Sequence, residues 1–143
     1  MKKILKTITT LIMATLMTVT IGCKGNGTLV IKESDTYIVI TASNKQMQIT
    51  NDTTLVDYMN SLKEDGKLEF EMSGGMVVSI NGIANPADWS SCWMFYTSDE
   101  DNANYAWGTI EYKSNLYGST MYGAEKLKVK DGCMYILVFQ SFS

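Results

Sequence analysis

Most of the chain from Thr28 onward consists of short runs of β-branched, aromatic and other apolar residues, separated by turn-forming residues. The segment KLEFEM shows the pattern most clearly, because charged and apolar residues alternate strictly from Lys67 to Met72. Such alternation is typical of a strand with one buried face. Other strands are expected at residues 29–31, 37–41, 76–83, 92–97, 107–112 and 133–142, with a shorter one at 46–50. The pattern therefore restricts the fold to a sheet-rich one.

One segment has helical periodicity instead. Its apolar side chains fall at i, i+3, i+4 and i+7 and form a single stripe, made by Leu55, Tyr58, Met59 and Leu62. Thr54 and Asp57 are spaced for a capping box, and Gly66 stands where a helix often ends in a left-handed residue. We predict a helix of about ten residues, which must pack on a sheet because an isolated helix of that length is marginal.

The order of these elements indicates the fold class. Two strands precede the helix and several follow it, and the most apolar run, CMYILVFQSF, is expected to be the central strand. We therefore predict an α+β domain. Its architecture is expected to be a β-grasp-like mixed sheet with one short helix packed on one face.

The first residues have the pattern of an export signal. Lys2, Lys3 and Lys6 precede an uncharged run over residues 7–22, which is shorter than the ~20 residues of a membrane-spanning helix. The run ends in TIGC, which resembles a bacterial lipobox. We predict a lipoprotein signal peptide at 1–22, lipidation of Cys23, a flexible tether at 23–27 and a folded domain at 28–143. The alternative is an ordinary secreted protein in which this cysteine is coincidental.

Composition excludes several functions for the exported part. Removing Lys2, Lys3 and Lys6 from the twelve lysines leaves nine, against fifteen Asp plus Glu, and the sequence has neither Arg nor His. Nucleic-acid binding is therefore not expected, since it needs a basic face. Without His there is no base to activate a Ser or Cys nucleophile, so we predict a protein that is not an enzyme and requires no cofactor.

Two further cysteines, Cys92 and Cys133, leave two alternatives open. An exported protein can form a disulfide, but two buried free thiols are equally compatible with the sequence. Each cysteine begins a predicted strand. If those strands are antiparallel neighbours, as a β-grasp order suggests, the two starts lie at opposite ends and a disulfide is disfavoured.

Aromatic residues are the main candidates for ligand contact. On an alternating strand, Trp93 and Phe95 point to one face, whereas Cys92, Met94 and Tyr96 point to the other. One face is expected to be core, with Phe95 in it, and the other could be an open platform for a flat ligand. Core and platform remain equal alternatives for Tyr96. The candidate ligand-binding residues are Trp93, Tyr96, Trp107, Tyr117 and Tyr122.

Two charged segments are weaker candidates for binding sites than the aromatic residues. The acidic stretch 99–102 could hold a cation through Asp99 and Asp101, although it lacks the spacing of a calcium loop, and we favour a solvated loop over residues 98–104. The lysines at 126, 128 and 130 alternate with apolar residues, so they are expected to form a basic row on one face of a strand, which could meet an anionic headgroup or a ligand phosphate. Simple exposure of an alternating face is the preferred interpretation of this row.

Three motifs in order, GGMVVSINGI, WMFYT and VKDGCMYILVF, resemble the transcobalamin-like C-terminal domain family. The matching elements are the hairpin end at 79–82, the tryptophan strand at 93–96 and the turn at 130–132, and the resemblance spans residues 38–142. The family is named after the smaller, β-rich domain of the animal cobalamin carriers transcobalamin and intrinsic factor. The resemblance implies a β-grasp-like domain that binds a corrinoid on an open face, together with a second molecule, or by passing it to a transporter.

Together these features predict an extracytoplasmic ligand-binding lipoprotein on the outer face of a bacterial membrane. Its expected ligand is a corrinoid such as cobalamin, which it would pass to a membrane importer. Two alternatives remain. One is a cell-surface module that binds protein or glycan without a small ligand, and the other is a cation-binding lipoprotein that uses the 99–102 loop.

Overall fold

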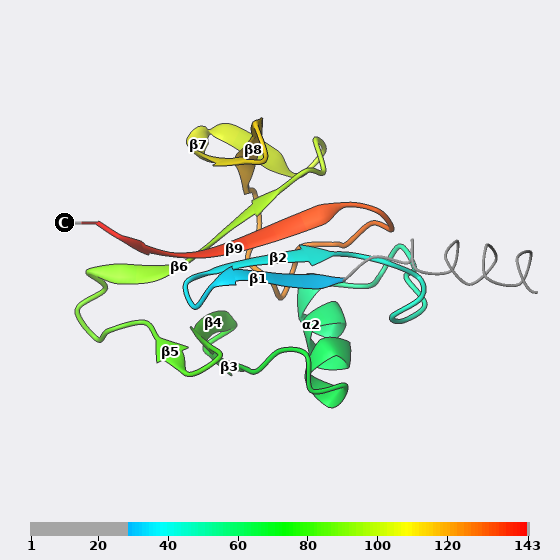
Figure 1. Cartoon of the computed structure of the whole chain (residues 1–143), viewed down its shortest axis with the longest axis horizontal. Helices are drawn as coiled ribbons and strands as arrows, with labels where there is room; N and C mark the ends of the chain where they lie inside the picture. Colours follow the sequence, from blue (N-terminus) through cyan, green and yellow to red (C-terminus); the bar gives the residue numbers. More distant parts are fainter. Residues whose placement is uncertain (1–28, 143) are drawn as a thin grey trace, which may run out of the picture.

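A computed structural model describes residues 29–142 of the chain (Figure 1). These residues form nine strands and one α-helix, so the predicted α+β class is confirmed. Within this span, no helix combines the length and the apolar character that crossing a membrane requires. The predicted signal peptide at 1–22, the lipidation site Cys23 and the tether at 23–27 lie outside the described residues.

The strands form two sheets. The large sheet has the order β1-β2-β9-β6-β8-β7. Its strands are β1 (Val30–Ser34), β2 (Tyr37–Thr41), β6 (Ser91–Thr97), β7 (Ala103–Tyr112), β8 (Asn115–Thr120) and β9 (Met134–Ser141). The small sheet contains β3 (Phe70–Ser73), β4 (Met76–Ile80) and β5 (Ile83–Ala84), in that order.

All strand pairings among residues 29–142 are antiparallel, so the mixed sheet that was predicted is not found. The reason lies in the first hairpin. Ser34 pairs with Tyr37, and the short turn between them reverses the chain so that β2, rather than β1, lies beside β9. A strand running in the direction of β1 at that position would have been parallel to β9.

The prediction that the last apolar run is a central strand is confirmed. β9 lies between β2 and β6, and its residues 135–138 are buried. Tyr135 and Leu137 point to one face of the sheet, whereas Ile136 and Val138 point to the other. Burial on both faces explains why this run is continuously apolar instead of alternating.

The predicted helix is also confirmed. α2 spans Leu55–Glu64 and buries the four residues of the predicted stripe. The Thr54 side chain accepts from the Asp57 backbone N–H, and the Asp57 side chain accepts from the Thr54 backbone N–H, which is a complete capping box. Gly66 follows with φ 70°, so it has the left-handed conformation expected after the helix end.

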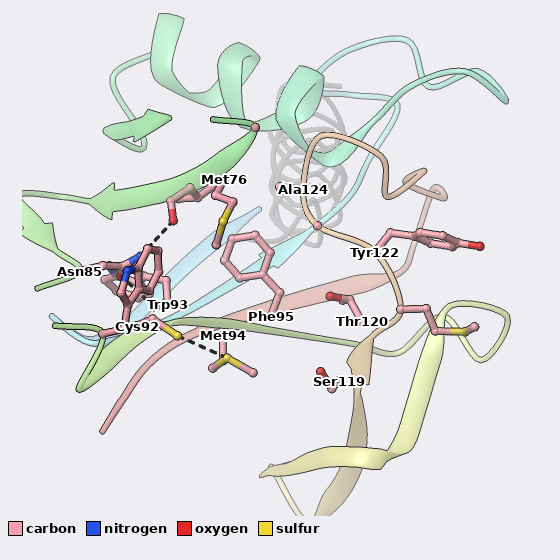
Figure 2. A pocket seen from close by; sticks show the side chains of 15 residues that line it. Met76, Asn85, Cys92, Trp93, Met94, Phe95, Ser119, Thr120, Tyr122 and Ala124 are labelled. Carbon is pink, nitrogen blue, oxygen red and sulfur yellow. Dashed lines mark hydrogen bonds between the residues drawn. The ribbon is translucent and has the colours of Figure 1, made fainter. Parts of the chain in front are cut away.

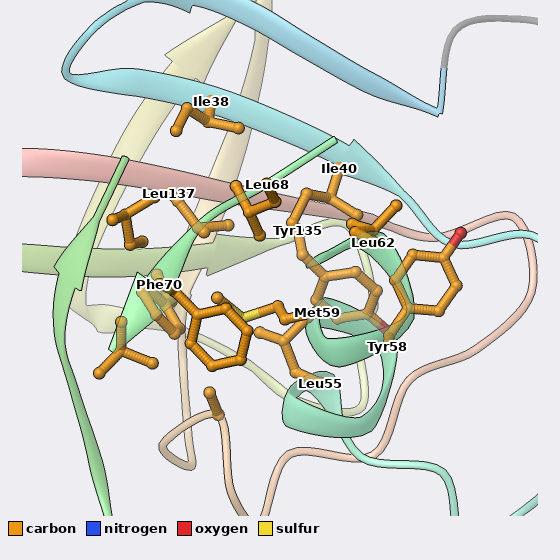
Figure 3. Packing of buried hydrophobic residues seen from close by; sticks show 14 of the residues in the cluster. Ile38, Ile40, Leu55, Tyr58, Met59, Leu62, Leu68, Phe70, Tyr135 and Leu137 are labelled. Carbon is orange, nitrogen blue, oxygen red and sulfur yellow. The ribbon is translucent and has the colours of Figure 1, made fainter. Parts of the chain in front are cut away.

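The domain has two apolar layers, one on each face of the large sheet. The main core lies between that sheet, α2 and the small sheet, and Figure 3 shows helix residues meeting Tyr135 and Leu137. A smaller outer core, defined by buried Val39, Tyr96, Ile136 and Val138, lies on the opposite face. The β7–β8 hairpin folds over this face, far from α2 (Figure 1).

Two segments differ from their predicted structure. Residues 46–50 form no strand; Met47 and Ile49 pack against the edge of the main core without joining a sheet. The lysine-rich segment 126–130 makes only an isolated bridge, between Lys128 and Thr54. Alternation persists there because the apolar residues between the lysines are buried, so the pattern reports on burial and not on strand pairing.

The Gly- and Tyr-rich segment, to which no strand was assigned, contains β8. This strand pairs with β7 and, near its end, with β6. A Cβ added at Gly118 would lie 3.1 Å from the Ala103 Cβ, which is closer than ordinary contact. A side chain at this position would force β7 to move by a few tenths of an ångström, so glycine suits the close approach of the two strands. The low strand propensity of glycine hides the strand in the sequence.

Both remaining thiols, Cys92 and Cys133, are free. β6 and β9 are antiparallel neighbours, and Cys92 pairs with Gln140, near the far end of β9 from Cys133. The register argument against a disulfide is confirmed.

Candidate ligand-binding pocket

A pocket forms where β8 separates from β6. β6 pairs with β9 along its whole length, but it pairs with β8 only at Tyr96 and Thr97. The first half of β6 therefore has an edge without a neighbouring strand. Asn85 covers part of this edge: its Oδ1 accepts from the Trp93 backbone N–H at 3.0 Å, and its Nδ2 donates to the Val77 carbonyl at 3.3 Å.

The pocket has a volume of about 250 Å³ and is bordered by β4, β6, the loop around residues 85–89 and the segment 119–124 (Figure 2). Four aromatic side chains line it: Trp89, Trp93, Phe95 and Tyr122. Its size falls just below the range of about 300–1,000 Å³ typical of small-molecule sites, and its aromatic lining resembles theirs. It can hold one ring system or a flat edge of a larger ligand.

Trp93 is both core and pocket wall. Only 6% of this residue is exposed, and its indole Nε1 donates to the Ile83 carbonyl at 2.8 Å. Its ring also packs against Phe139, with centroids 5.5 Å apart. Because these contacts fix the ring, Trp93 gives the pocket a rigid wall.

Trp89 is strained and half exposed at the pocket rim. Its backbone has φ 57°, a conformation that is rare for a bulky residue, and 50% of the residue is exposed. The Trp89 N–H donates to the Pro86 carbonyl, and Asp88 accepts hydrogen bonds from Ser90, so this turn is held on both sides. Strain of this kind concentrates at functional sites. Sequence reasoning did not select Trp89, because a positive φ leaves no signal in residue type.

Sulfur atoms and one hydroxyl supply other pocket-lining atoms. The Cys92 Sγ lies 3.6 Å from the Met94 Sδ, and Met76 also lines the pocket. Burial raises the pKa of the Cys92 thiol above its ordinary value. Ser119 is only 6% exposed and lines the same pocket.

The five predicted ligand-binding residues do not form one site. Trp93 and Tyr122 line the pocket. Tyr96 belongs to the outer core, where its hydroxyl donates to Gln140 Oε1, and Tyr117 packs against the same core. Trp107 lies on β7, is 64% exposed and does not line the pocket. Of the two alternatives for Tyr96, core is correct, and the predicted core position of Phe95 is confirmed.

The acidic stretch has an internal partner. The Lys130 Nζ lies 2.9 Å from Asp99 Oδ1 and 2.6 Å from Asp101 Oδ2, the position that a bound cation would otherwise take. The expected solvated loop is wrong at Asp99, which is 4% exposed. No group of three Asp, Glu, Cys or His side chains suited to a metal ion occurs among the described residues.

The row of lysines has separate surroundings. Lys130 holds the acidic stretch, and the Lys128 Nζ donates to the Asp52 carbonyl at 3.2 Å. Lys126 is exposed on the turn that follows the pocket segment. These three amines therefore do not form the continuous basic strand face that an anionic partner would need.

Asp99→Asn is expected to lower the free energy of unfolding near neutral pH. The variant should also lose less of this free energy than the parent protein as the pH falls. Burial alone would raise the pKa of Asp99, but hydrogen bonds from Lys130, Asn102 and the Asp101 backbone hold that pKa below its usual value. The ionised carboxylate thus stabilises the fold above its unfolded pKa of about 3.9, and this contribution is lost as pH falls through the lower folded pKa.

Urea titrations between pH 7 and pH 2 measure this effect. Glu100→Gln is the matched control, since it removes a carboxylate of the same loop that binds the Tyr105 hydroxyl and not Lys130. If the free energy of unfolding falls by the same amount with decreasing pH in the parent protein and in Asp99→Asn, the role assigned to Asp99 is wrong.

No protein-family model matches this chain, and neither a curated protein nor a solved structure matches it significantly.

Proposed function

We propose that this chain is an exported, lipid-anchored binding protein without catalytic activity, which holds a flat and largely apolar part of a ligand in the pocket beside β6. One observation carries the proposal. The pocket is bordered by aromatic side chains, and one of them, Trp89, is kept half exposed at a positive φ by a well-bonded turn. Exposure and strain both cost stability, so contact with a ligand would explain why they are retained.

The sharper form of this proposal is that the ligand is a corrinoid, which the protein passes to a membrane importer. This form rests on the resemblance to the transcobalamin-like C-terminal domain family. A pocket of about 250 Å³ cannot enclose a corrin ring with its side chains. A corrinoid would therefore insert one flat edge or its nucleotide base, with the remainder against the exposed rim and a second protein.

The β-grasp-like architecture belongs to the same proposal. It is supported by one helix that packs on a sheet whose last strand is central. The antiparallel pairing of β2 with β9 is a departure from the mixed sheet of that architecture.

Equilibrium dialysis of the full chain in detergent against cobalamin and against cobinamide, which lacks the nucleotide base, tests the proposal. Corrin absorbance reports the bound fraction. We expect saturable binding of one corrinoid per chain. If the base occupies the pocket, cobalamin binds more tightly than cobinamide, whereas equal affinity indicates that a corrin edge does.

Trp89→Gly is expected to weaken this binding about tenfold or more while the fold stays stable. Glycine relieves a left-handed strain of about 1–2 kcal/mol and loses roughly 0.5–1 kcal/mol to backbone entropy, so the free energy of unfolding should change little. Urea unfolding checks this part, and dialysis checks the affinity.

Trp107→Ala is the matched control, because it removes an exposed tryptophan that lies outside the pocket. Equal loss of affinity in both variants would refute the pocket as the site. If neither corrinoid binds at high micromolar concentration, the corrinoid form of the proposal is wrong.

A second candidate is a surface module for protein or glycan. It is favoured by three exposed apolar residues of the β7–β8 hairpin, Tyr105, Trp107 and Leu116. On this candidate Trp107→Ala, and not Trp89→Gly, would abolish binding to immobilised cell-surface glycans.

A further inference from the structure

The pocket lies at the edge of β6 and not over one of its faces. Successive side chains of a strand point to opposite faces of the sheet. Both faces contribute to the lining, since Cys92 and Met94 come from one face and Trp93 and Phe95 from the other. The pocket therefore follows the edge that β8 has left, and the backbone of β6 borders any group bound there.

The Trp93 backbone points its N–H and C=O groups to this edge. Trp93 pairs with Phe139 of β9, but the two residues do not bond to each other: the Phe139 N–H donates to the Thr36 carbonyl. The Trp93 N–H donates instead to the Asn85 Oδ1. In an antiparallel pair of this type, the N–H and C=O groups of each residue point away from the partner strand. The Trp93 carbonyl is therefore on the pocket side of β6, as its N–H is.

Asn85 supplies only half of what a neighbouring strand would supply. In a hydrogen-bonded pair of an antiparallel ladder, the two residues exchange two N–H···O bonds. The Asn85 Oδ1 accepts from the Trp93 N–H at 3.0 Å, but the Asn85 Nδ2 donates to the Val77 carbonyl at 3.3 Å (Figure 2). β8 does not pair with Trp93. Neither Asn85 nor β8 thus supplies a donor to the Trp93 carbonyl, and a ligand can.

The side chains around this edge restrict the charge and shape of such a ligand. None of the residues that line the pocket is Asp, Glu or Lys, and the sequence has no Arg or His. An ionised group would lose its hydration on entering without gaining an opposite charge, so the entering group should be neutral. The aromatic rings of Trp93 and Phe95 favour a planar group.

We propose that the part of the ligand that enters this pocket is a neutral planar group with an N–H donor, either a heterocyclic ring N–H or a carboxamide, which bonds to the Trp93 carbonyl. The inference rests on the proposed function, because it concerns the same pocket. Asn85 is a positioning residue that sets the selectivity. By accepting from the Trp93 N–H, it occupies the donor that would otherwise bind a carbonyl group of a ligand.

Two pairs of small probes test the need for a donor, by equilibrium dialysis of the full chain with detergent in both chambers. Indole and benzofuran have the same ring shape, but only indole has an N–H. Benzamide and methyl benzoate make the same comparison for a carboxamide. We expect the donor-bearing probe of at least one pair to bind about three- to tenfold more tightly, the usual contribution of one hydrogen bond. The pair with the larger ratio identifies the kind of group.

The outcomes separate this inference from the proposed function. If the two probes of each pair bind equally and Trp89→Gly weakens them all, the pocket binds ligands but the inference is wrong. If no probe binds at millimolar concentration, the inference is also wrong, and the corrinoid dialysis still decides on the proposed function. Trp107→Ala, which lies outside the pocket, should leave every affinity unchanged.

Asn85→Ala tests the selectivity, or Asn85→Leu if the alanine variant does not fold. Either variant frees the Trp93 N–H, so the ratio of the indole affinity to that of indanone, which has a carbonyl and no donor, should fall about threefold or more. Asn85→Asp still accepts from the Trp93 N–H and should keep the preference for indole. A purely structural role would weaken all probes alike, and an unchanged ratio would overturn the role of Asn85. Urea unfolding curves verify that each variant is folded.

Discussion

Replacing Trp93 with alanine is expected to lower the free energy of unfolding by about 3–5 kcal/mol, the usual loss for a buried aromatic residue. The ring lies between the Ile83 carbonyl, to which it donates a hydrogen bond, and Phe139. Its removal would leave a cavity that joins the existing pocket and would leave the Ile83 carbonyl without its donor. Urea denaturation followed by circular dichroism measures the loss.

Two further variants divide this loss into its causes. Trp93→Phe keeps most of the apolar contact but leaves Ile83 without a donor, so we expect a smaller loss of about 1–3 kcal/mol. Trp107→Ala removes an exposed tryptophan and should change stability by less than about 0.5 kcal/mol. A Trp93→Ala variant as stable as Trp107→Ala would show that the ring is not core.

This result decides how binding can be tested. An affinity lost in Trp93→Ala could reflect unfolding as easily as a missing contact. Trp89 is the better probe, because its side chain is half exposed and its backbone is strained. The tryptophan strand was a reasonable place to look for ligand contact, but the residue that tests it lies in the preceding loop.

Local patterns predicted the elements that local physics determines. The stripe of α2 and its cap at Thr54 and Asp57 depend on residues within a few turns of one another, so their spacing was sufficient. β9 could be identified as central because burial on both faces needs a continuous apolar run. In each case one segment of sequence contained the whole signal.

The pocket could not be predicted in the same way, because it depends on contacts between distant segments. It exists because β8 leaves β6 after two residue pairs and because Asn85 bridges β4 to β6. From the sequence, Asn85 could be recognised only as a turn residue that precedes Pro86. Asp99 was misjudged for a similar reason, since its partner Lys130 is 31 residues away in the chain.

Tyr58→Ala is expected to cause the second large loss of stability, again about 3–5 kcal/mol. Tyr58 is fully buried in the main core. Its hydroxyl donates to the Thr41 carbonyl at 3.2 Å and accepts from the Ser43 backbone N–H at 3.0 Å, which attaches α2 to the end of β2. Tyr58→Phe keeps the ring and leaves Ser43 unpaired, so it should cost about 1–3 kcal/mol.

The loss of stability in Tyr58→Ala should also destabilise the pocket wall. The first amides of α2 donate outside the helix, from Leu55 to the Leu127 carbonyl and from Val56 to the Ala124 carbonyl. The helix therefore holds the segment that carries Tyr122 into the pocket wall. Native-state hydrogen exchange should show faster exchange in α2 together with residues 122–129, because a ten-residue helix is stable only while it is packed. If only α2 exchanges faster, the pocket wall is held independently of the helix. Tyr105→Ala is the control, because Tyr105 is an exposed tyrosine on β7, and it should not accelerate exchange in either region.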